Sequence, residues 1–212
     1  MIYQLEQDNI WFPKPELAEE DGLLAIGGDL SPDRLLLAYS HGIFPWYSDD
    51  TPLMWYSPHH RFVLFPEKLK ISASMKQVMR NGRFSITTDQ AFAEVISACS
   101  AILRKGQEGT WITADMQAAY IKLHELGYAH SVEVWHNGLL SGGLYGIRIN
   151  EVFCGESMFS RQSNASKLAL IALCQNFKFQ MIDCQMHTPH LESMGAEFIS
   201  RNEYLRILQQ NA

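Results

Sequence analysis

The chain has 212 residues, of which 47% are hydrophobic and 19% are charged, and its formal net charge is −6. These values describe a globular protein with one large domain, or one domain and a small appendage. They exclude a uniformly basic protein but allow a local basic patch. The N-terminus is too polar for a signal peptide and no apolar run approaches the roughly 18 residues of a membrane span, so we expect no membrane contact.

The four cysteines are scattered along the chain without a paired spacing. Cysteines of this kind are typical of reduced, mostly buried thiols in a protein of the cytoplasm, which is where we expect this one to act. They are Cys99, Cys154, Cys174 and Cys184.

Residues 1–60 are rich in turns and aromatic side chains and contain one clearly marked helix. Ser31 suits the N-cap, Pro32 the first helical position, and Gly42 a left-handed stop. The apolar face of this helix comprises Leu35, Leu36 and Tyr39. The preceding Gly27-Gly28-Asp29 segment predicts a tight turn, because it lacks the lysine of a phosphate loop and the spacing of a dinucleotide site.

Residues 61–84 hold the clearest concentration of basic side chains, with Glu67 as the single acid among them. The basic residues are Arg61, Lys68, Lys70, Lys76, Arg80 and Arg83. Such a run is compatible with the solvated face of a helix and with a surface that contacts an anion or a nucleic acid. Charge alone does not decide between the two.

Two helices are expected next. Thr88 or Asp89 would cap a helix that runs to Cys99, and Thr113 would begin a second helix that ends at Gly127. The buried face of the second helix would comprise Met116, Tyr120 and Leu123.

From residue 129 the apolar period changes to two, which predicts strands. Residues 130–135, 139–149 and 152–158 form an expected antiparallel meander, with a hairpin turn at Asn137-Gly138. Gly142-Gly143 inside the second strand indicates a bulge or a close backbone approach.

The last third of the chain returns to helices around one further strand. Ser163 or Asn164 would cap a helix that ends near Asn176, residues 180–184 would form a strand, and residues 189–194 a short helix. The order of these elements indicates an α+β fold.

Two carboxylates lie in or at the end of predicted strands. Glu156 stands between apolar neighbours, where a bare charge would be costly, so it must be paired, neutral or functional. Asp183 ends the later strand, and Gln185 follows it. We expect Glu156 and Asp183 to face each other across one active site, as acid/base groups, cation ligands or a site for a cationic substrate. A salt-bridged or capping role is the structural alternative for each.

Other chemistries have weaker support. Cys184, His187 and His190 could in principle hold zinc, or supply a cysteine nucleophile and its base, but zinc requires further ligands. No Gly-x-Ser-x-Gly elbow of a serine enzyme is present. Residues 159–166 lack the glycines of a loop that seats coenzyme A, so that donor is disfavoured, and we expect neither a metal nor another cofactor.

Several motifs occur together in a characteristic order. They are Gly22-Leu-Leu-Ala-Ile-Gly-Gly-Asp-Leu-Ser-Pro32, Ala38-Tyr39, Gly42-Ile-Phe-Pro-Trp46, Ser57-Pro58 with Arg61, Gly109-Thr-Trp-Ile112, His130-Ser-Val-Glu133, Gly142-Gly-Leu-Tyr-Gly146, Phe153-Cys-Gly-Glu-Ser-Met-Phe-Ser160, Asn164-Ala-Ser-Lys167 and Ile182-Asp-Cys-Gln185. Over nearly its whole length the chain resembles the leucyl/phenylalanyl-tRNA–protein transferases of bacteria. The resemblance implies a small N-terminal domain (residues 1–60) on an acetyltransferase-like (GNAT) catalytic domain (residues 61–212) with a mixed, largely antiparallel sheet.

The resemblance also implies an activity: transfer of Leu or Phe from aminoacyl-tRNA to the N-terminal Arg or Lys of a protein, which marks that protein for degradation. It implies an apolar pocket for the transferred side chain, formed by Leu144, Phe153, Leu173 and Ile182. It places Trp46 and Trp111 on or near the terminal adenosine. Leu144 and Leu173 depart from the Met and Phe expected in other members, which leaves the choice between Leu and Phe open.

A mechanism follows from the ester donor, which is already activated. Positioning the acceptor amine and accepting its proton would supply most of the acceleration. We hypothesise that Asp183, through or beside Gln185, orients the amine and takes the proton, while Glu156 holds the cationic acceptor or assists at the amine. Lys76, Arg80 and Arg83 would contact tRNA. We expect a monomer; a small-molecule acyltransferase and a non-catalytic tRNA- or degron-binding module are the rival hypotheses.

Overall fold

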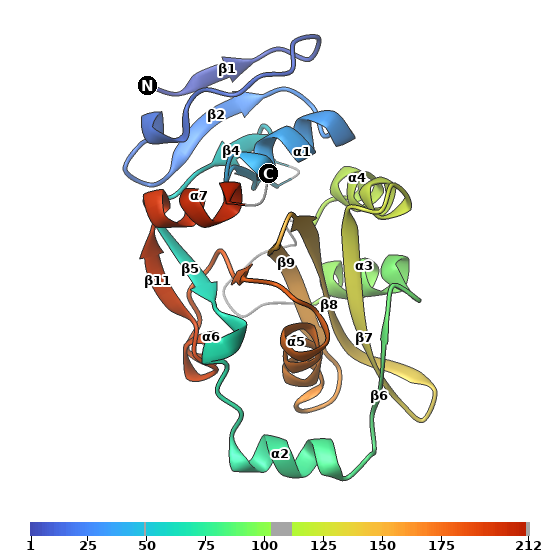
Figure 1. The fold of residues 1–212 in the computed structure, drawn as a ribbon. Coiled ribbons are helices and arrows are strands. Elements are labelled where there is room, and N and C mark those ends of the chain that lie inside the picture. Colours follow the sequence, from blue (N-terminus) through green and yellow to red (C-terminus); the bar gives the residue numbers. More distant parts are fainter. Residues whose placement is uncertain (49, 103–111, 211–212) are drawn as a thin grey trace.

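The computed structural model describes residues 1–48, 50–102 and 112–210. Within them, two β-sheets are surrounded by helices (Figure 1). The strands are β1 (Tyr3–Leu5), β2 (Leu23–Gly27), β3 (Phe44–Pro45), β4 (Met54–Tyr56), β5 (His60–Leu64), β6 (Ser85–Thr88), β7 (Ala129–His136), β8 (Leu139–Ile149), β9 (Val152–Ser160), β10 (Met181–Asp183) and β11 (Glu197–Ser200). The helices are η1 (Pro15–Leu17), α1 (Pro32–Ser40), η2 (Pro66–Lys68), α2 (Ala73–Arg80), α3 (Phe92–Ser100), α4 (Ala114–Glu125), α5 (Ala165–Asn176), α6 (Pro189–Ser193) and α7 (Arg201–Gln209).

The first sheet lies within the N-terminal 56 residues and has the strand order β1-β2-β4-β3. The expected turn follows β2, where Gly27 and Gly28 have φ angles of 87° and 76°. A Cβ at Gly28 would lie 3.0 Å from Nε of Arg34, so glycine leaves room for this buried side chain. Arg34 Nη2 donates to the carbonyls of Glu6, Gln7 and Asn9 at 2.7–3.1 Å, which ties the N-terminal segment to α1.

The second sheet has seven strands in the order β11-β5-β10-β9-β8-β7-β6. The predicted meander is present, because β7, β8 and β9 pair antiparallel. Asn137 and Gly138 both have positive φ, as a two-residue hairpin turn requires. β9 and β10 form the parallel pair. The α+β class and the mixed, largely antiparallel sheet are therefore confirmed.

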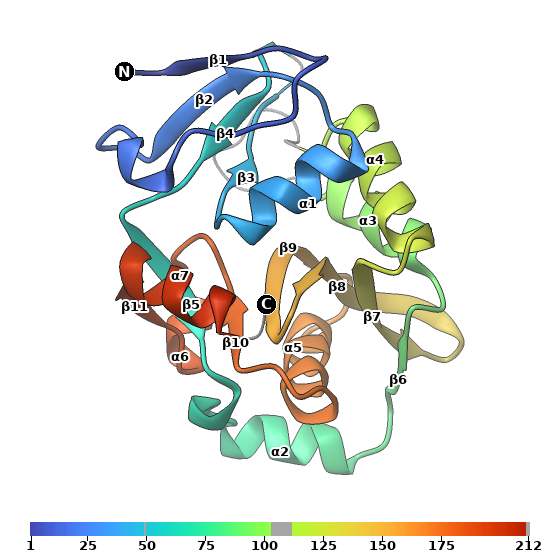
Figure 2. The same cartoon turned by 45° about the horizontal axis from the view of Figure 1, so that its top comes forward.

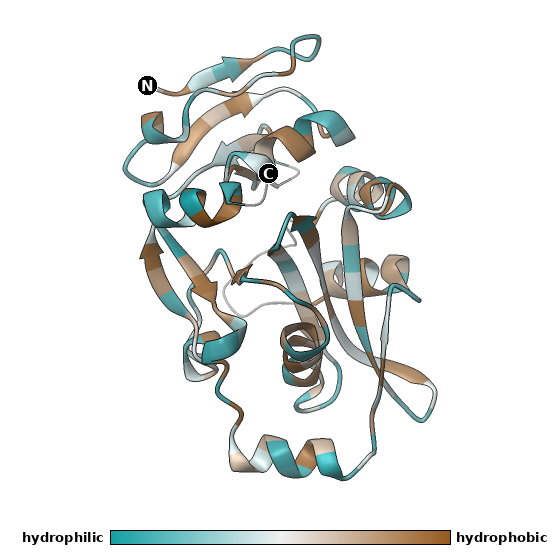
Figure 3. Ribbon diagram, viewed as in Figure 1, coloured by the Kyte–Doolittle hydropathy of each residue, from teal (hydrophilic) through white to brown (hydrophobic). Residues whose placement is uncertain are grey.

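Two apolar layers cover the faces of this sheet. One face packs on α5, the helix at the centre of Figure 3, whose buried side chains include Leu170 and Leu173. The other face packs on the first sheet and on α1, α3, α4 and α7 (Figure 2). The chain passes from the first sheet to the second between Tyr56 and His60, next to the expected boundary at residue 60. None of the described helices has both the length and the apolar composition needed to cross a bilayer.

Local signals in the sequence were reliable at several helix ends. α1 starts at Pro32, and Gly42 after it has φ 69°. Thr113 caps α4 by accepting a hydrogen bond from the Met116 amide at 3.2 Å. A Cβ at Gly142 would lie 2.5 Å from that of Ala165, so the predicted close approach is the contact between β8 and α5.

Two predictions were wrong in detail. The helix expected to be capped by Thr88 or Asp89 begins at Phe92, after strand β6. Asp89 instead accepts from the Ser131 amide at 2.8 Å and contacts His130, because its carboxylate is turned toward β7. Arg61 was grouped with the exposed basic run, yet it lies buried in β5.

Candidate active site

The two strands that carry the candidate carboxylates separate at the site. β10 ends where Asp183 pairs with Cys154, whereas β9 continues to Ser160. On its other side β9 has a bulge: Gly155 pairs with Gly146 and the next pair joins Ser157 to Tyr145, so Glu156 is the extra residue. Bulges redirect side chains, often next to active sites. The strand end and the bulge together bring Glu156 and Asp183 to one opening in the sheet.

Glu156 is 7% exposed and is surrounded by neutral donors. Its Oε1 accepts from the Tyr39 hydroxyl at 2.7 Å and from Gln185 Nε2 at 2.8 Å, and its Oε2 accepts from the Tyr120 hydroxyl at 3.1 Å. Burial raises the pKa of Glu156 to about 7, and the hydrogen bonds from the two tyrosines and Gln185 offset the burial only in part. A carboxyl group with such a pKa can exchange a proton near neutral pH.

Asp183 is fully buried and has a cationic partner. Its Oδ2 is ion-paired with Nη2 of Arg61, which enters from β5. Its Oδ1 accepts from the backbone amide of Gln185 at 3.0 Å. Gln185 has φ 56°, in the left-handed region, so this hydrogen bond holds a turn that directs the Gln185 side chain toward Glu156. Glu156 and Asp183 are thus connected through Gln185, which hydrogen-bonds to both carboxylates.

A pocket of about 460 Å³ opens at this point, a size typical of small-molecule sites. Its lining on the α5 side is apolar and includes four predicted residues, Leu144, Phe153, Leu173 and Ile182. On the opposite side it is lined by Phe44, Pro45 and Trp46 from the first sheet and by Glu156. The pocket thus passes between β9 and β10 and joins both faces of the sheet. Trp111, the other predicted aromatic, lies outside the described residues.

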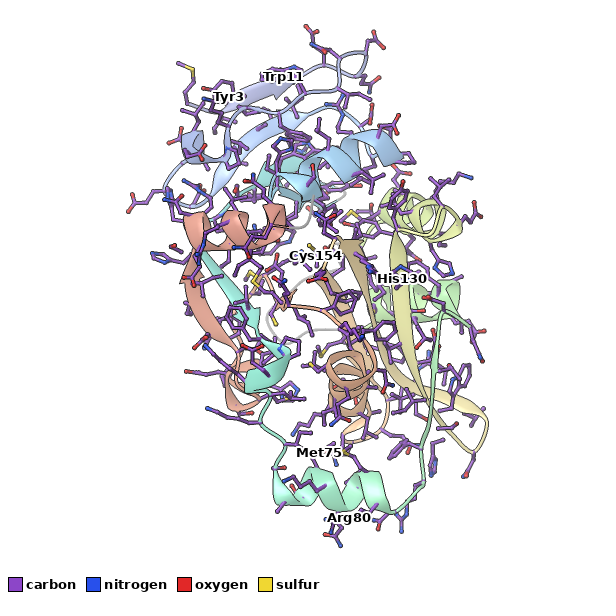
Figure 4. All side chains as sticks on the ribbon, viewed as in Figure 1. Tyr3, Trp11, Met75, Arg80, His130 and Cys154 are labelled. Carbon is purple, nitrogen blue, oxygen red and sulfur yellow. The ribbon has the colours of Figure 1, made fainter. Side chains whose placement is uncertain are left out.

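The three predicted tRNA contacts lie elsewhere, on and after α2. Lys76, Arg80 and Arg83 are all exposed, while Met75 packs against the α5 layer. In Figure 4 Arg80 points away from the body of the protein and Met75 lies on the inner side of the helix. The remainder of the basic run is not uniform, since Lys68 is paired with Glu197. The structure therefore separates this exposed cationic helix from the buried Arg61.

The alternative chemistries receive no support. Among the described residues no group of three His, Cys, Asp or Glu side chains could hold a metal ion. Burial raises the pKa of the Cys184 thiol well above its usual range, which works against a thiolate nucleophile at neutral pH. None of the four cysteines forms a disulfide.

Sequence reasoning missed three residues of the site. Tyr39 and Tyr120 were predicted on the apolar faces of two helices and are buried there, and in addition their hydroxyls bind Glu156 and contact each other. A buried tyrosine needs a partner for its hydroxyl, so two tyrosines in predicted cores and one unpaired strand carboxylate were an available signal. Arg61 belonged to one of the motifs that carry the family resemblance, but its charge gave no signal of a role in the site, since it stood in one run with exposed cations.

Comparison with known proteins identifies the family of the chain. The family model described as leucyl/phenylalanyl-tRNA protein transferase matches residues 63–209, and the model of its N-terminal domain matches residues 28–59. The chain belongs to this family. A leucyl/phenylalanyl-tRNA–protein transferase of Syntrophobacter fumaroxidans is 54% identical over 99% of this chain and 91% of its own. One of Syntrophus aciditrophicus is 55% identical over 95% of this chain and 86% of its own.

Solved structures give only slight likenesses. A GCN5-related N-acetyltransferase from Kribbella flavida is 9% identical, covers 82% of this chain and 62% of its own, and has a TM-score of 0.36. L-PGS from Bacillus licheniformis is 9% identical, covers 75% of this chain and 50% of its own, and has a TM-score of 0.41. The family assignment rests on the family models and the relatives, which make the protein an aminoacyltransferase.

Proposed function

We propose that this transferase moves Leu or Phe from aminoacyl-tRNA to the N-terminal Arg or Lys of acceptor proteins, and that the product N-terminus marks them for degradation. The observation that carries the proposal is the apolar pocket that ends beside the hydrogen-bonded pair of Glu156 and Gln185. An aminoacyl group whose apolar side chain occupies this pocket would have its ester carbon next to polar groups that can bind and orient an amine. The relatives named above support the tRNA donor and the protein acceptor.

The donor would be held at its 3′ end. Its Leu or Phe side chain would occupy the space between Leu144, Phe153, Leu173 and Ile182. Trp46 lines the opposite side of the pocket and offers a ring to the terminal adenosine. Stacking on a base is worth about 1–3 kcal/mol, which matters for a substrate held by its end. Trp111 retains its expected stacking role as part of this proposal.

The reaction joins an amine nitrogen to an ester carbon and releases a ribose hydroxyl. An α-amine has a pKa of roughly 7.7–8.0, so on the order of a tenth of acceptors are neutral at pH 7. In our proposal Gln185 orients this neutral amine, and the proton lost as the C–N bond forms is taken by Glu156 and finally by the departing ribose oxygen. The pKa of about 7 suits Glu156 to that exchange.

Asp183 would act as an orienting group in this mechanism. Its burial, its ion pair with Arg61 and its hydrogen bond to the Gln185 amide support this role over that of proton acceptor. Recognition of the acceptor's cationic side chain remains assigned to Glu156, as first expected. No cofactor is required, because the ester itself supplies the driving force.

The body of the tRNA would lie along α2. Lys76, Arg80 and Arg83 present exposed positive charge there, and phosphate contacts of this kind are sequence-tolerant and sensitive to salt. We further propose that the enzyme works as a monomer in the cytoplasm, where free thiols such as those of its four cysteines persist.

One experiment distinguishes this function from its rivals. The protein is mixed with labelled leucyl-tRNA and a peptide that begins with Arg, with and without prior ribonuclease treatment, and a peptide that begins with Asp is the matched control. Label in the Arg peptide with intact tRNA alone supports the proposal. Turnover that survives ribonuclease indicates a small-molecule acyltransferase, and tRNA binding without label in peptide indicates a binding module; either outcome contradicts the proposal.

A further inference from the structure

Arg61 is the most completely enclosed cation near the pocket. Its side chain is 2% exposed, and its guanidinium lies between two rings, 5.0 Å from the centroid of Phe44 and 4.2 Å from that of Tyr204. Nη1 donates to the Gly42 carbonyl at 2.7 Å, and Nη2 donates to Asp183. Burial disfavours the charge on Arg61, but the Asp183 carboxylate together with Tyr204 and Cys154 more than offsets this effect and keeps its pKa raised.

These contacts connect three separate segments of the chain. Gly42 lies two residues before the segment Phe44–Trp46 that lines one side of the pocket. Asp183 ends β10, and Tyr204 belongs to α7. The guanidinium therefore fixes the pocket wall contributed by the first sheet relative to the strand end in the second sheet.

The connection continues to the proposed reacting groups. Asp183 uses one oxygen for Arg61 and the other for the Gln185 amide. The Gln185 backbone lies in a left-handed conformation that non-glycine residues seldom adopt without support. From this turn Gln185 Nε2 reaches Glu156 at 2.8 Å. A change at Arg61 would thus reach the groups at the amine through Asp183.

The geometry demands arginine rather than any cation. Two donors must point in two directions, toward Gly42 and Asp183, while a flat face fits between Phe44 and Tyr204. A guanidinium supplies both features, whereas the ammonium of lysine is a point charge without a face.

We propose that Arg61 is a positioning residue for aminoacyl transfer. It holds Asp183, which in turn holds the backbone amide of Gln185 and so places the Gln185 side chain at the acceptor amine. The inference rests on the proposed function. It assigns Arg61 a role in the chemical step, whereas the exposed cations of the same basic run are proposed to bind tRNA. Arg61 itself touches neither substrate. Its effect should therefore be mainly on the rate of transfer, because the exposed cations of α2, which are separate from Arg61, are proposed to supply most of the affinity for charged tRNA.

The test compares Arg61→Ala with the wild type in single-turnover transfer of leucine to the Arg peptide. The rate should fall about 100-fold, as expected for misplaced reacting groups, while the Kd for leucyl-tRNA stays within about threefold. Added guanidinium ion should raise the transfer rate of Arg61→Ala about tenfold, because it can occupy the site of the missing side chain. Arg206→Ala, which removes an exposed arginine of α7, is the matched control and should show neither the loss nor the rescue.

Arg61→Lys covers the case in which Arg61→Ala does not fold, because it keeps a cation beside the buried Asp183. Arg61→Lys should unfold in one thermal transition. It should transfer leucine at least about tenfold more slowly than the wild type, and guanidinium ion should not restore the rate. A folded Arg61→Ala or Arg61→Lys protein with wild-type rate, or a loss explained by Kd alone, overturns the inference. An inactive wild type would instead contradict the proposed function.

Discussion

At the scale of single residues, the site gives two carboxylates different properties through their neighbours. Glu156 is buried among the neutral hydroxyls of Tyr39 and Tyr120, so its charge is not compensated. Asp183 is buried against the guanidinium of Arg61, so the charge of Asp183 is compensated. Pairs of titratable groups in contrasting environments are the usual basis for dividing roles in catalysis. This contrast is why we assign proton exchange to Glu156 and orientation to Asp183.

Replacing Glu156 by Gln should stabilise the protein at pH 8 and change it little at pH 4.5. Burial raises the pKa of Glu156 from 4.5 to about 7, so the stability gained from its protonated form is complete below about pH 4.5 and is lost as pH rises through 7. The difference corresponds to about 3 kcal/mol at pH 8. An amide is neutral throughout and avoids this loss. Urea unfolding of both proteins across this pH range measures the effect.

The control for this measurement is Glu20→Gln, which removes an exposed carboxylate. It should shift the unfolding free energy by less than about 0.5 kcal/mol at either pH. Parallel stability curves for Glu156→Gln and the wild type between pH 5 and 8 would contradict the shifted pKa and weaken the assignment of Glu156 as proton acceptor.

Leu173 is the residue at which a substitution should most readily change the preference of the enzyme for Leu or Phe as the transferred amino acid. It is buried at the apolar end of the pocket, and Leu173→Phe would fill space that the ring of a transferred Phe needs. We expect the ratio of kcat/KM for phenylalanyl-tRNA to that for leucyl-tRNA to fall about tenfold. Leu173→Met conserves volume and should keep the ratio within about threefold. Because each enzyme is compared on two donors, general damage cancels; an unchanged ratio in Leu173→Phe would place the side chain elsewhere.

At the scale of helices and strands, predictability followed the locality of the signal. α4 was predictable because Thr113 caps it from within the same turn, and the β7–β8 hairpin because Asn137-Gly138 adopt positive φ without help from distant residues. β5 gave no such signal. Its Arg61 was indistinguishable in sequence from the exposed cations of α2, and its burial depends on Asp183, 122 residues away.

The same distinction explains which parts of the site were foreseen. Glu156 and Asp183 stood out because carboxylates in buried strands need an explanation, and that argument requires no knowledge of pairing. The contacts of Tyr39 and Tyr120 with Glu156 depend on how α1 and α4 pack over β9, which no local pattern encodes. The bulge that redirects Glu156 likewise depends on the register between β8 and β9.

Helix α2 should act as a unit in tRNA binding. Arg80→Glu should weaken binding of leucyl-tRNA and lower the slope of log K against log salt by about one unit, because one phosphate contact is lost. Lys14→Glu makes the same charge change on an exposed residue of the N-terminal segment, at the opposite end of the molecule in Figure 1, and is the control. The relative use of Leu and Phe should not change in either. Equal effects of the two substitutions would show that net charge, and not α2, governs binding.

At the scale of the whole molecule, the two sheets share one core. Leu35 and Tyr39 of α1 belong to the same buried cluster as Met116 and Tyr120 of α4. The pocket also takes one wall from each sheet. Residues 1–60 were expected to form a separate small domain, and the family models also divide the chain near this point. The continuous core nevertheless favours one folding unit over two.

We therefore predict a single cooperative unfolding transition, with equal calorimetric and van't Hoff enthalpies, because neither sheet can expose its side of the shared core independently. Leu35→Ala, which opens a cavity at a fully buried position of α1, should cost about 2–5 kcal/mol and shift this one transition as a whole. Leu17→Ala removes a side chain that is 48% exposed and should leave it nearly unchanged. Differential scanning calorimetry that resolves a second transition, moved by Leu35→Ala while the first stays in place, would establish two independent domains and show that the pocket forms only when they dock.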